Sequence, residues 1–398
     1  MSEATGTLTY LDHAATTPLR TEVAEAMAAV HAEPLGNPTG THPLGQRARR
    51  LLEEARDEVA AFAGCEPGEV IFTSGGTESA NLAVFGTLGA LAQAGAGGPG
   101  RPVLLPSAVE HPAVLESCRA AARAGLAEVH ELAVDETGCL TAATVRQALD
   151  RHVGVGLVAL MLANNETGVL EPVTEVVSLV AEMAPGAVVF TDAVQGAAFL
   201  DLGVATAHAG LVGLSAHKVG GPVGTGALVV RAPATVAAAL HGGGQERERR
   251  SGTQDVAGAV GLATALRLAQ AERSDAAIRV AVLRDRLADG LLSSVSLACR
   301  TVPAGTPVLP GHLHLCLEGI EREELLVALG RVGICASAGS SCASGALEPS
   351  HVLSAMAVPD TLAAGAVRFT LGPGTSEADV ARALELVPLT VSDLLGNC

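Results

Sequence analysis

Lys218 is the residue of this sequence whose surroundings point most directly to chemistry. The run 214–222 reads LSAHKVGGP, so apolar and small residues flank the amine. In such surroundings an ammonium loses solvation, its pKa falls, and the neutral nucleophilic amine becomes accessible near neutral pH. A nucleophilic lysine forms Schiff bases with carbonyl compounds, which is the attachment that pyridoxal phosphate (PLP) requires. The alternative is a lysine that extends from a strand end into solvent, so the choice depends on other motifs.

A glycine turn at 74–77 is a candidate phosphate site. Residues 69–73, EVIFT, are typical of a buried strand, and 74–82, SGGTESANL, read as a turn that leads into a helix. Two glycines let the backbone approach a ligand closely, and the N–H groups at the start of a helix attract an anion. We therefore expect a phosphate at Gly76 and Thr77. An ordinary capped helix after a tight turn remains the alternative.

A second strand delivers a carboxylate to the same region. The apolar run 188–192, VVFTD, ends in Asp192, and ligands collect at the carboxyl ends of strands in open parallel sheets. A carboxylate there can keep a pyridine nitrogen protonated, so that the ring acts as an electron sink, and Gln195 can reach the ring hydroxyl. The alternative for Asp192 is a helix N-cap.

Cys342 lies in a segment whose side chains are too small to form a hydrophobic core. Residues 335–345, CASAGSSCASG, consist of small side chains without apolar periodicity, which predicts a mobile loop that carries Cys342. The alternative for an isolated cysteine is a buried structural role.

In this order, the motifs resemble those of the cysteine desulfurases of the NifS/IscS-like group, within the class V aminotransferase superfamily. The resemblance begins with YLDHAATTP at 10–18 and covers nearly the whole chain, and further blocks that carry it are NNETG at 164–168, GGGQER at 242–247, RSGT at 250–253, EPSHV at 348–352 and VRF at 367–369. It implies an α/β fold, the PLP-dependent transferase fold of aspartate aminotransferase (fold type I). A large, mostly parallel-sheet domain would span 16–262. A smaller α/β domain, 1–15 and 263–398, would carry the cysteine loop at about 336–346.

The resemblance also assigns roles to single residues. Lys218 would carry the cofactor and act as a base, and His111 would stack on the cofactor ring and shuttle protons. The cofactor would further be bound by Gly76, Thr77, Asn165, Asp192, Gln195, Ser215 and His217, and by Thr253 from the neighbouring subunit of a homodimer. Asn165 and Arg368 would bind the substrate carboxylate. Cys342 would be the nucleophile that becomes a persulfide.

These roles imply a PLP-dependent cysteine desulfurase that converts L-cysteine to L-alanine and leaves the sulfur on Cys342. The sulfur would pass to an acceptor protein, either an iron–sulfur scaffold or a tRNA-thiolating enzyme. Another class V PLP enzyme, such as a selenocysteine lyase or an aminotransferase, would need Lys218 but tolerate loss of Cys342. A sulfur-relay protein without turnover would need only the thiol, and the set of Lys218, His111, Asp192 and Arg368 argues against it.

Composition agrees with this reading. The 398 residues suit two domains, and the hydrophobic content of 48% is enough for sizeable cores. The net charge of −17 argues against direct contact with nucleic acid or a membrane surface, since both are negative. Eight scattered cysteines without metal-type spacing, and no basic, apolar signal peptide, predict a cytoplasmic protein with no metal site.

The hydrophobic pattern predicts the elements that position these residues. Apolar runs at about 69–73, 102–106, 156–162, 187–191, 211–214 and 226–230 alternate with helical patterns, as in a mostly parallel sheet. Residues 255–295 read as one long helix, followed by strands near 312–317, 332–335 and 367–371 and helices at about 321–330, 350–357 and 376–395. We expect 89–100 to be a surface loop. The mixed-charge run 246–250 is either a solvated loop or, as the resemblance implies, a stretch that approaches the dimer interface beside Thr253.

Overall fold

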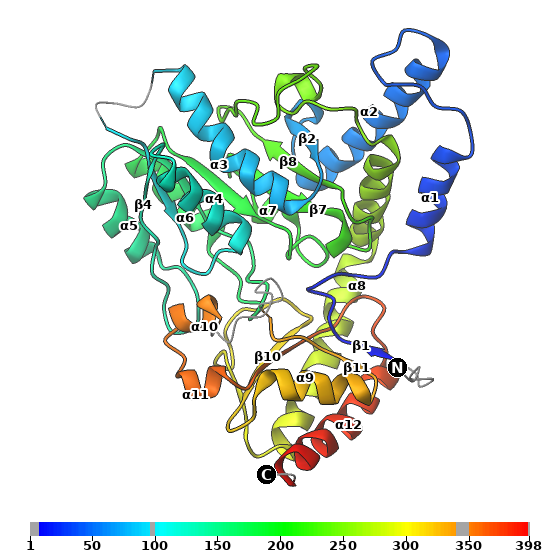
Figure 1. The fold of residues 1–398 in the computed structure, drawn as a ribbon, viewed down its shortest axis with the longest axis vertical. Helices are drawn as coiled ribbons and strands as arrows, with labels where there is room; N and C mark the ends of the chain where they lie inside the picture. The colour runs from blue at the N-terminus through cyan, green and yellow to red at the C-terminus, as the bar shows by residue number, and fades with distance from the viewer. Residues whose placement is uncertain (1–7, 96–99, 340–349, 397–398) are drawn as a thin grey trace.

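The structure is a computed structural model that describes residues 8–95, 100–339 and 350–396 (Figure 1). Its largest element is a seven-stranded sheet with the strand order β2-β8-β7-β6-β5-β3-β4. The strands are β2 (Val70–Thr73), β3 (Val103–Pro106), β4 (Glu128–Val129), β5 (Val155–Ala159), β6 (Val188–Asp192), β7 (Leu211–Ser215) and β8 (Gly226–Val230). β4, β3, β5, β6 and β7 run parallel, whereas β8 is antiparallel to both β7 and β2. The mostly parallel sheet predicted from the apolar runs is therefore confirmed.

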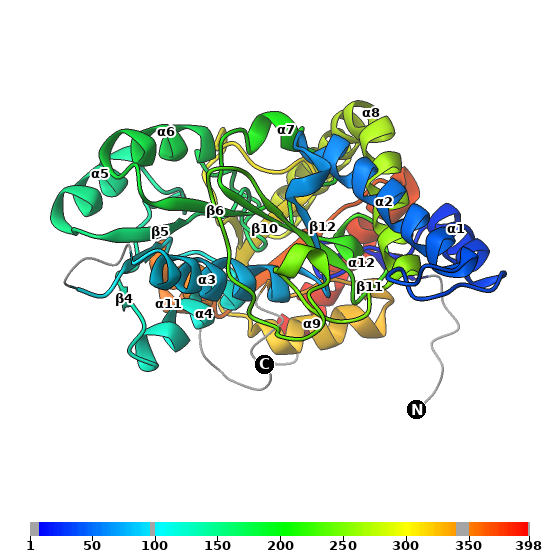
Figure 2. The same ribbon diagram turned by 90° about the horizontal axis from the view of Figure 1, so that it is seen from above.

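Helices cover both faces of this sheet, because neighbouring residues of each strand point to opposite sides. Ile71, Leu104 and Phe190 pack in one cluster with residues of α3 (Gly76–Gln93) and α4 (Pro112–Arg123). Val70 and Leu105 pack in a second cluster with the helices of the other face, α2 (Pro43–Ala63), α5 (Ala142–Arg151), α6 (Val173–Met183) and the start of α8. Figure 2 shows α3 and α4 on one side of the sheet and α5 and α6 on the other.

The long helix α8 (Val256–Ser294) connects this sheet to the rest of the chain. Its first half is buried against α1 (Thr21–His31) and α2, and its second half packs on α12 (Glu377–Gly396). The side chain of Asp255 accepts a hydrogen bond from the N–H of Gly258 and so caps the helix start. The single helix predicted over 255–295 is confirmed.

The C-terminal third of the chain, together with β1, forms two small sheets. β12 (Ala366–Thr370), β10 (His312–Leu317) and β9 (Ala298–Arg300) form an antiparallel sheet, and β1 (Thr9–Tyr10) pairs in parallel with β11 (Ile334–Cys335). The helices here are α9 (Arg322–Arg331), α10 (His351–Ala355), α11 (Asp360–Ala363) and α12. The start of the chain therefore belongs structurally with its C-terminal third (Figure 1). The boundaries 16–262 and 263–398 for two domains stay predictions.

Two expectations from the sequence are wrong. Residues 89–93 form the last turn of α3 and not a loop. Their alanine- and glycine-rich sequence favours a loop, but burial of Thr87 and Leu88 in the preceding turn keeps the helix going. Glu246, expected in a solvated loop, is buried and paired with the buried Arg56 through two hydrogen bonds of 2.8 and 2.9 Å. The remaining short elements are helix α7 (Leu202–Ala205) and the 3-10 turns Pro67–Glu69, Ala216–Lys218 and Glu246–Glu248. No helix of the described residues is both long and apolar enough to span a bilayer.

Candidate active site

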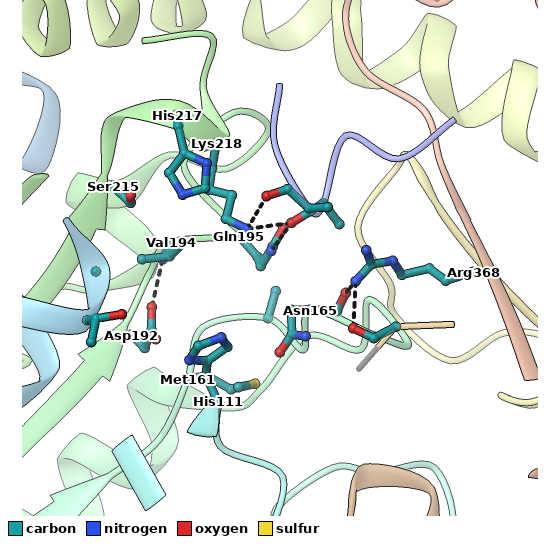
Figure 3. A pocket seen from close by; sticks show the side chains of 16 residues that line it. His111, Met161, Asn165, Asp192, Val194, Gln195, Ser215, His217, Lys218 and Arg368 are labelled. Carbon is teal, nitrogen blue, oxygen red and sulfur yellow. Dashed lines mark hydrogen bonds between the residues drawn. The ribbon is translucent and has the colours of Figure 1, made fainter. Parts of the chain in front are cut away.

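A cavity of about 280 Å³ lies where the carboxyl ends of β6 and β7 face the N-terminal segment and β12 (Figure 3). Asp192 is the last residue of β6 and Ser215 the last of β7, so the sheet itself delivers two polar side chains to this cavity. The cavity is lined by Ala14, Ala15, Gly76, Thr77, His111, Met161, Ala163, Asn165, Asp192, Val194, Gln195, Ser215, His217, Lys218, Gly339 and Arg368. Segments that are far apart in the sequence therefore meet at one space.

Lys218 is held by the backbone of the N-terminal segment. Its Nζ donates hydrogen bonds to the carbonyl oxygens of Ala14, at 2.6 Å, and Ala15, at 2.9 Å. The Gln195 side chain donates to the same Ala14 oxygen at 2.9 Å. Lys218 is also the only lysine in the sequence. Any reaction of this protein that consumes a lysine amine therefore takes place in this cavity.

One corner of the cavity is built to accept an anion. α3 starts at Gly76, and a Cβ at that position would lie 2.9 Å from Cγ2 of Val194, so only glycine leaves the helix start open. The free N–H groups of the first turn point out of the helix end, beside the side chains of Thr77 and Ser215. Burial and, to a smaller extent, the charge of Lys218 together lower the pKa of His217 to about 4, so this ring is neutral at pH 7.

Asp192 supplies the negative charge of the cavity. One carboxylate oxygen accepts a hydrogen bond of 3.0 Å from the N–H of Val194. Burial raises the pKa of Asp192, while the nearby charges of His111 and Lys218 act in the opposite direction. A cationic N–H placed in the cavity would therefore pair with this carboxylate and stabilise its charged form.

His111 has a fixed orientation. It is the N-cap of α4, and its Nδ1 accepts a hydrogen bond of 3.1 Å from the N–H of Ala113. Burial lowers its pKa, Asp192 raises it, and the charges of Lys218 and His351 lower it further. A neutral ring whose Nδ1 is an acceptor carries its proton on Nε2. In this arrangement His111 is a hydrogen-bond donor to its surroundings.

Arg368 closes the opposite side of the cavity. It lies in the middle of β12 and is only 1% exposed. Nη1 donates to the carbonyl oxygen of Asn165 at 2.7 Å, and Nη2 pairs with a carboxylate oxygen of Asp12 at 2.8 Å. Nε is buried and has no hydrogen-bond partner among the described residues. The guanidinium is thus locked in place and still has donor capacity for a ligand.

The chain as a whole has clear relatives among known proteins. The family model of class V aminotransferases matches residues 9–383. The chain belongs to the class V aminotransferase family. Among its relatives is an IscS-like cysteine desulfurase of Mycobacterium tuberculosis, 42% identical over 97% of this chain and 96% of that protein. A solved NifS-like protein superposes with a TM-score of 0.88 at 32% identity, over 97% of this chain and all of that one, and a structure of SspA in complex with cysteine does so with 0.78 at 27% identity, over 92% of this chain and all of that one.

The residues of this class V aminotransferase fit PLP. The open helix start at Gly76, with Thr77 and Ser215, is an anion site for the phosphate, and Asp192 suits a protonated ring nitrogen. Lys218 supplies the only side-chain amine of the chain in the same space. Phosphate donors, carboxylate and amine thus surround one cavity.

The structure brings together most of the residues singled out in the sequence. Of the predicted site residues, Thr253 is exposed and does not line the cavity as the described residues define it, and Cys342 lies outside the described residues. Sequence reasoning missed the carbonyl groups of Ala14 and Ala15 and the pairing of Asp12 with Arg368. Backbone carbonyls leave no residue-type signal, whereas Asp12 stands in the block 10–18, which already carried the family resemblance.

Proposed function

We propose that this protein is a PLP-dependent cysteine desulfurase that converts L-cysteine to L-alanine and transfers the sulfur to Cys342 as a persulfide. The observation that carries the proposal is the cavity that combines Lys218, Asp192 and the locked Arg368 and has Gly339 in its wall. Cys342 stands three positions after Gly339 in the sequence, which limits their Cα atoms to about 11 Å apart by chain length alone. The desulfurase names of its relatives support the same activity.

The roles of the residues follow from their positions. Bound PLP would supply an electron-withdrawing ring that stabilises negative charge at the substrate α-carbon. Lys218 would hold the cofactor and, as a free amine, take the proton from that carbon, guided by the carbonyl oxygens of Ala14 and Ala15. Arg368, with Asn165 beside it, would bind the substrate carboxylate and so fix which bonds face Lys218.

Sulfur transfer would be carried out by Cys342. Its thiolate attacks the substrate sulfur, an S–S bond forms, and the electron pair of the broken C–S bond stays on the substrate carbon, which is protonated to give alanine. This balance needs no external oxidant. His111 is the proposed proton-transfer residue, and it can accept the thiol proton only after Nδ1 releases the N–H of Ala113.

Three further assignments belong to the proposal. Thr253, on an exposed stretch, would reach the cofactor phosphate of a second subunit in a homodimer. The persulfide would pass to an iron–sulfur scaffold or a tRNA-thiolating enzyme. We place the protein in the cytoplasm, because its cysteines at 65, 118, 139, 299, 316 and 335 are all free thiols.

The test is to incubate the PLP-loaded protein with L-cysteine, quantify alanine, and search by intact-mass spectrometry for one added sulfur. We expect alanine and a persulfide on Cys342, and loss of both in Cys342→Ala. Cys299→Ala, which removes an exposed thiol of β9, is the matched control and should retain both. If Cys342→Ala still forms alanine or a keto acid at the wild-type rate, Cys342 is not the nucleophile and the chain catalyses a different PLP reaction.

A further inference from the structure

A second cavity, of about 330 Å³, lies beside β10 and shares no lining residue with the cavity that contains Lys218. Its walls come from Thr167, from the second half of α8, from β10 and from the loop 302–306. Sites for small ligands have volumes of about 300–1,000 Å³, whereas one water takes about 30 Å³ of liquid. The cavity is therefore large enough for a small molecule and too large for a single bridging water.

His312 presents unpaired ring nitrogens to this cavity. It is the first residue of β10 and is 6% exposed, and neither Nδ1 nor Nε2 has a hydrogen-bond partner among the described residues. Burial and, to a smaller extent, nearby positive charges, that of Arg368 first, lower the pKa of His312 to about 3. The ring is therefore neutral at pH 7 and carries one N–H donor. A buried donor without an acceptor is costly, so a bound molecule that supplies the acceptor would be stabilised.

His314 adds a third unpaired nitrogen. It lies two residues further along β10, so its side chain shares a face of the strand with that of His312, and both residues line the cavity. Its Nδ1 forms a hydrogen bond of 2.7 Å with the hydroxyl of Thr301, whereas its buried Nε2 bonds to no other described residue. Within the described ranges, no three His, Cys, Asp or Glu side chains are grouped so that they could hold a metal ion. The two rings therefore favour a ligand that accepts hydrogen bonds over a metal ion.

Two guanidinium groups make the cavity electropositive. Arg284 of α8 is largely buried, its Nε pairs with Asp285 at 2.6 Å, and its Nη1 reaches two backbone carbonyl oxygens only at 3.4 Å. Arg300, at the end of β9, contacts the exposed Asp289 at 3.4 Å. The lining contains these two arginines and one acid, the mostly exposed Asp285. It thus carries one more positive than negative charge, in a chain whose net charge is −17.

We propose that this cavity is a binding site for a small oxyanion, held by the guanidinium groups of Arg284 and Arg300 and by a ring nitrogen of His312. A phosphate or carboxylate has several acceptor oxygens and matches the fork of N–H donors of a guanidinium. The same ligand can supply the acceptor that the N–H of His312 lacks. The proposal does not rest on the desulfurase activity, since none of the roles above uses a residue of this cavity.

The test uses the PLP-loaded protein after reduction with borohydride, so that the cofactor occupies the anion corner beside Lys218. The protein, with 13C-labelled histidines, is titrated with inorganic phosphate and, separately, with malonate. The Cε1–Hε1 NMR signal of His312, identified by its absence in His312→Gln, is followed. We expect at least one probe to shift this signal saturably, with a Kd below about 5 mM. The two probes separate a phosphate ligand from a carboxylate ligand.

Variants decide whether a shift of the His312 signal reports binding in this cavity. Arg284→Gln should weaken binding by about tenfold to about a hundredfold, because hydrogen bonds to a charged group are lost. Arg286→Gln is the matched control, since Arg286 lies on the same helix with an exposed side chain and does not line the cavity as described. It should bind as the wild type does.

Arg300→Gln is a second variant, at a more exposed position that is safer for folding. It should weaken binding by at least about threefold. Thermal unfolding of each variant shows whether it is folded before binding is compared. The proposal is overturned if neither probe shifts the His312 signal saturably, or if every folded variant of Arg284 and Arg300 keeps the wild-type affinity.

Discussion

Arg368 offers the sharpest test of substrate recognition. Replacing it by Gln removes the charge but keeps a polar side chain in β12. The guanidinium is 1% exposed, so a carboxylate that reaches it is desolvated, and truncating one partner of a buried, hydrogen-bonded charge pair costs about 2–5 kcal/mol. Because Asp12 at 2.8 Å already neutralises part of the charge, we expect the lower half of that range, or about 30-fold to about 300-fold in kcat/KM.

The assay compares L-cysteine with 2-aminoethanethiol, which is cysteine without its carboxylate. Wild-type protein should prefer L-cysteine by about the same factor, and Arg368→Gln should lose that preference, because the loss falls only on the substrate that has a carboxylate. Arg231→Gln is the control, since Arg231 also donates to backbone carbonyls, of Thr206 and Ala63, but does not line the cavity as described. A variant that is slowed equally on both substrates would refute the reasoning and show that Arg368 only supports the fold.

Three further predictions concern single groups. Reduction of the PLP-loaded protein with borohydride should label one internal peptide, that of Lys218, the only lysine, and peptide mapping that finds this peptide unlabelled contradicts the cavity assignment. Arg56→Met should cost about 3–5 kcal/mol at pH 8, since it strands the buried carboxylate of Glu246. Burial alone would raise the pKa of Glu246, but Arg56 outweighs burial and the pKa is lowered, so the wild-type protein loses stability as the pH falls through that pKa. In Arg56→Met the unpaired carboxyl should take up a proton by pH 5, so the loss of stability relative to wild type should be smaller at pH 5 than at pH 8. Thermal unfolding of both proteins at the two pH values tests this. Burial lowers the pKa of His111. Titration of this ring should therefore not lower kcat/KM near pH 6.5, and the pH profiles of kcat/KM for the wild type and His111→Asn should have the same shape there.

The sequence predicted most of the large sheet because all of its strands except β4 are largely buried. Val103–Pro106 and Leu211–Ser215 are uninterrupted apolar runs, which helices on both faces require. β4 (Glu128–Val129) and β9 (Ala298–Arg300) escaped prediction because two or three partly exposed residues carry no periodicity. Residues 89–93 were mistaken for loop because small residues favour loops locally, and only packing keeps the helix going.

The site was predictable where residue type and strand position coincide. Asp192 ends one apolar strand and Lys218 follows another, so sequence alone placed them at the carboxyl ends of strands. The hydrogen bond of Lys218 to the carbonyl oxygen of Ala14 and that of Ser350 to Glu166 were not predictable, because each joins segments more than a hundred residues apart. Long-range contacts of this kind follow from topology, which a list of motifs does not contain.

The N-terminal wall of the cavity has a consequence for biosynthesis. The N–H of Ala14 donates to Oγ1 of Thr370, 356 residues later, and Thr9 pairs with Ile334. A chain leaves the ribosome from its N-terminus, so these residues emerge long before their partners are translated. The seven strands of the large sheet can pair while β12 is still unmade. The wall of the cavity that Arg368 supplies therefore forms only after β12 has been translated, and a truncated chain has the large sheet without this wall.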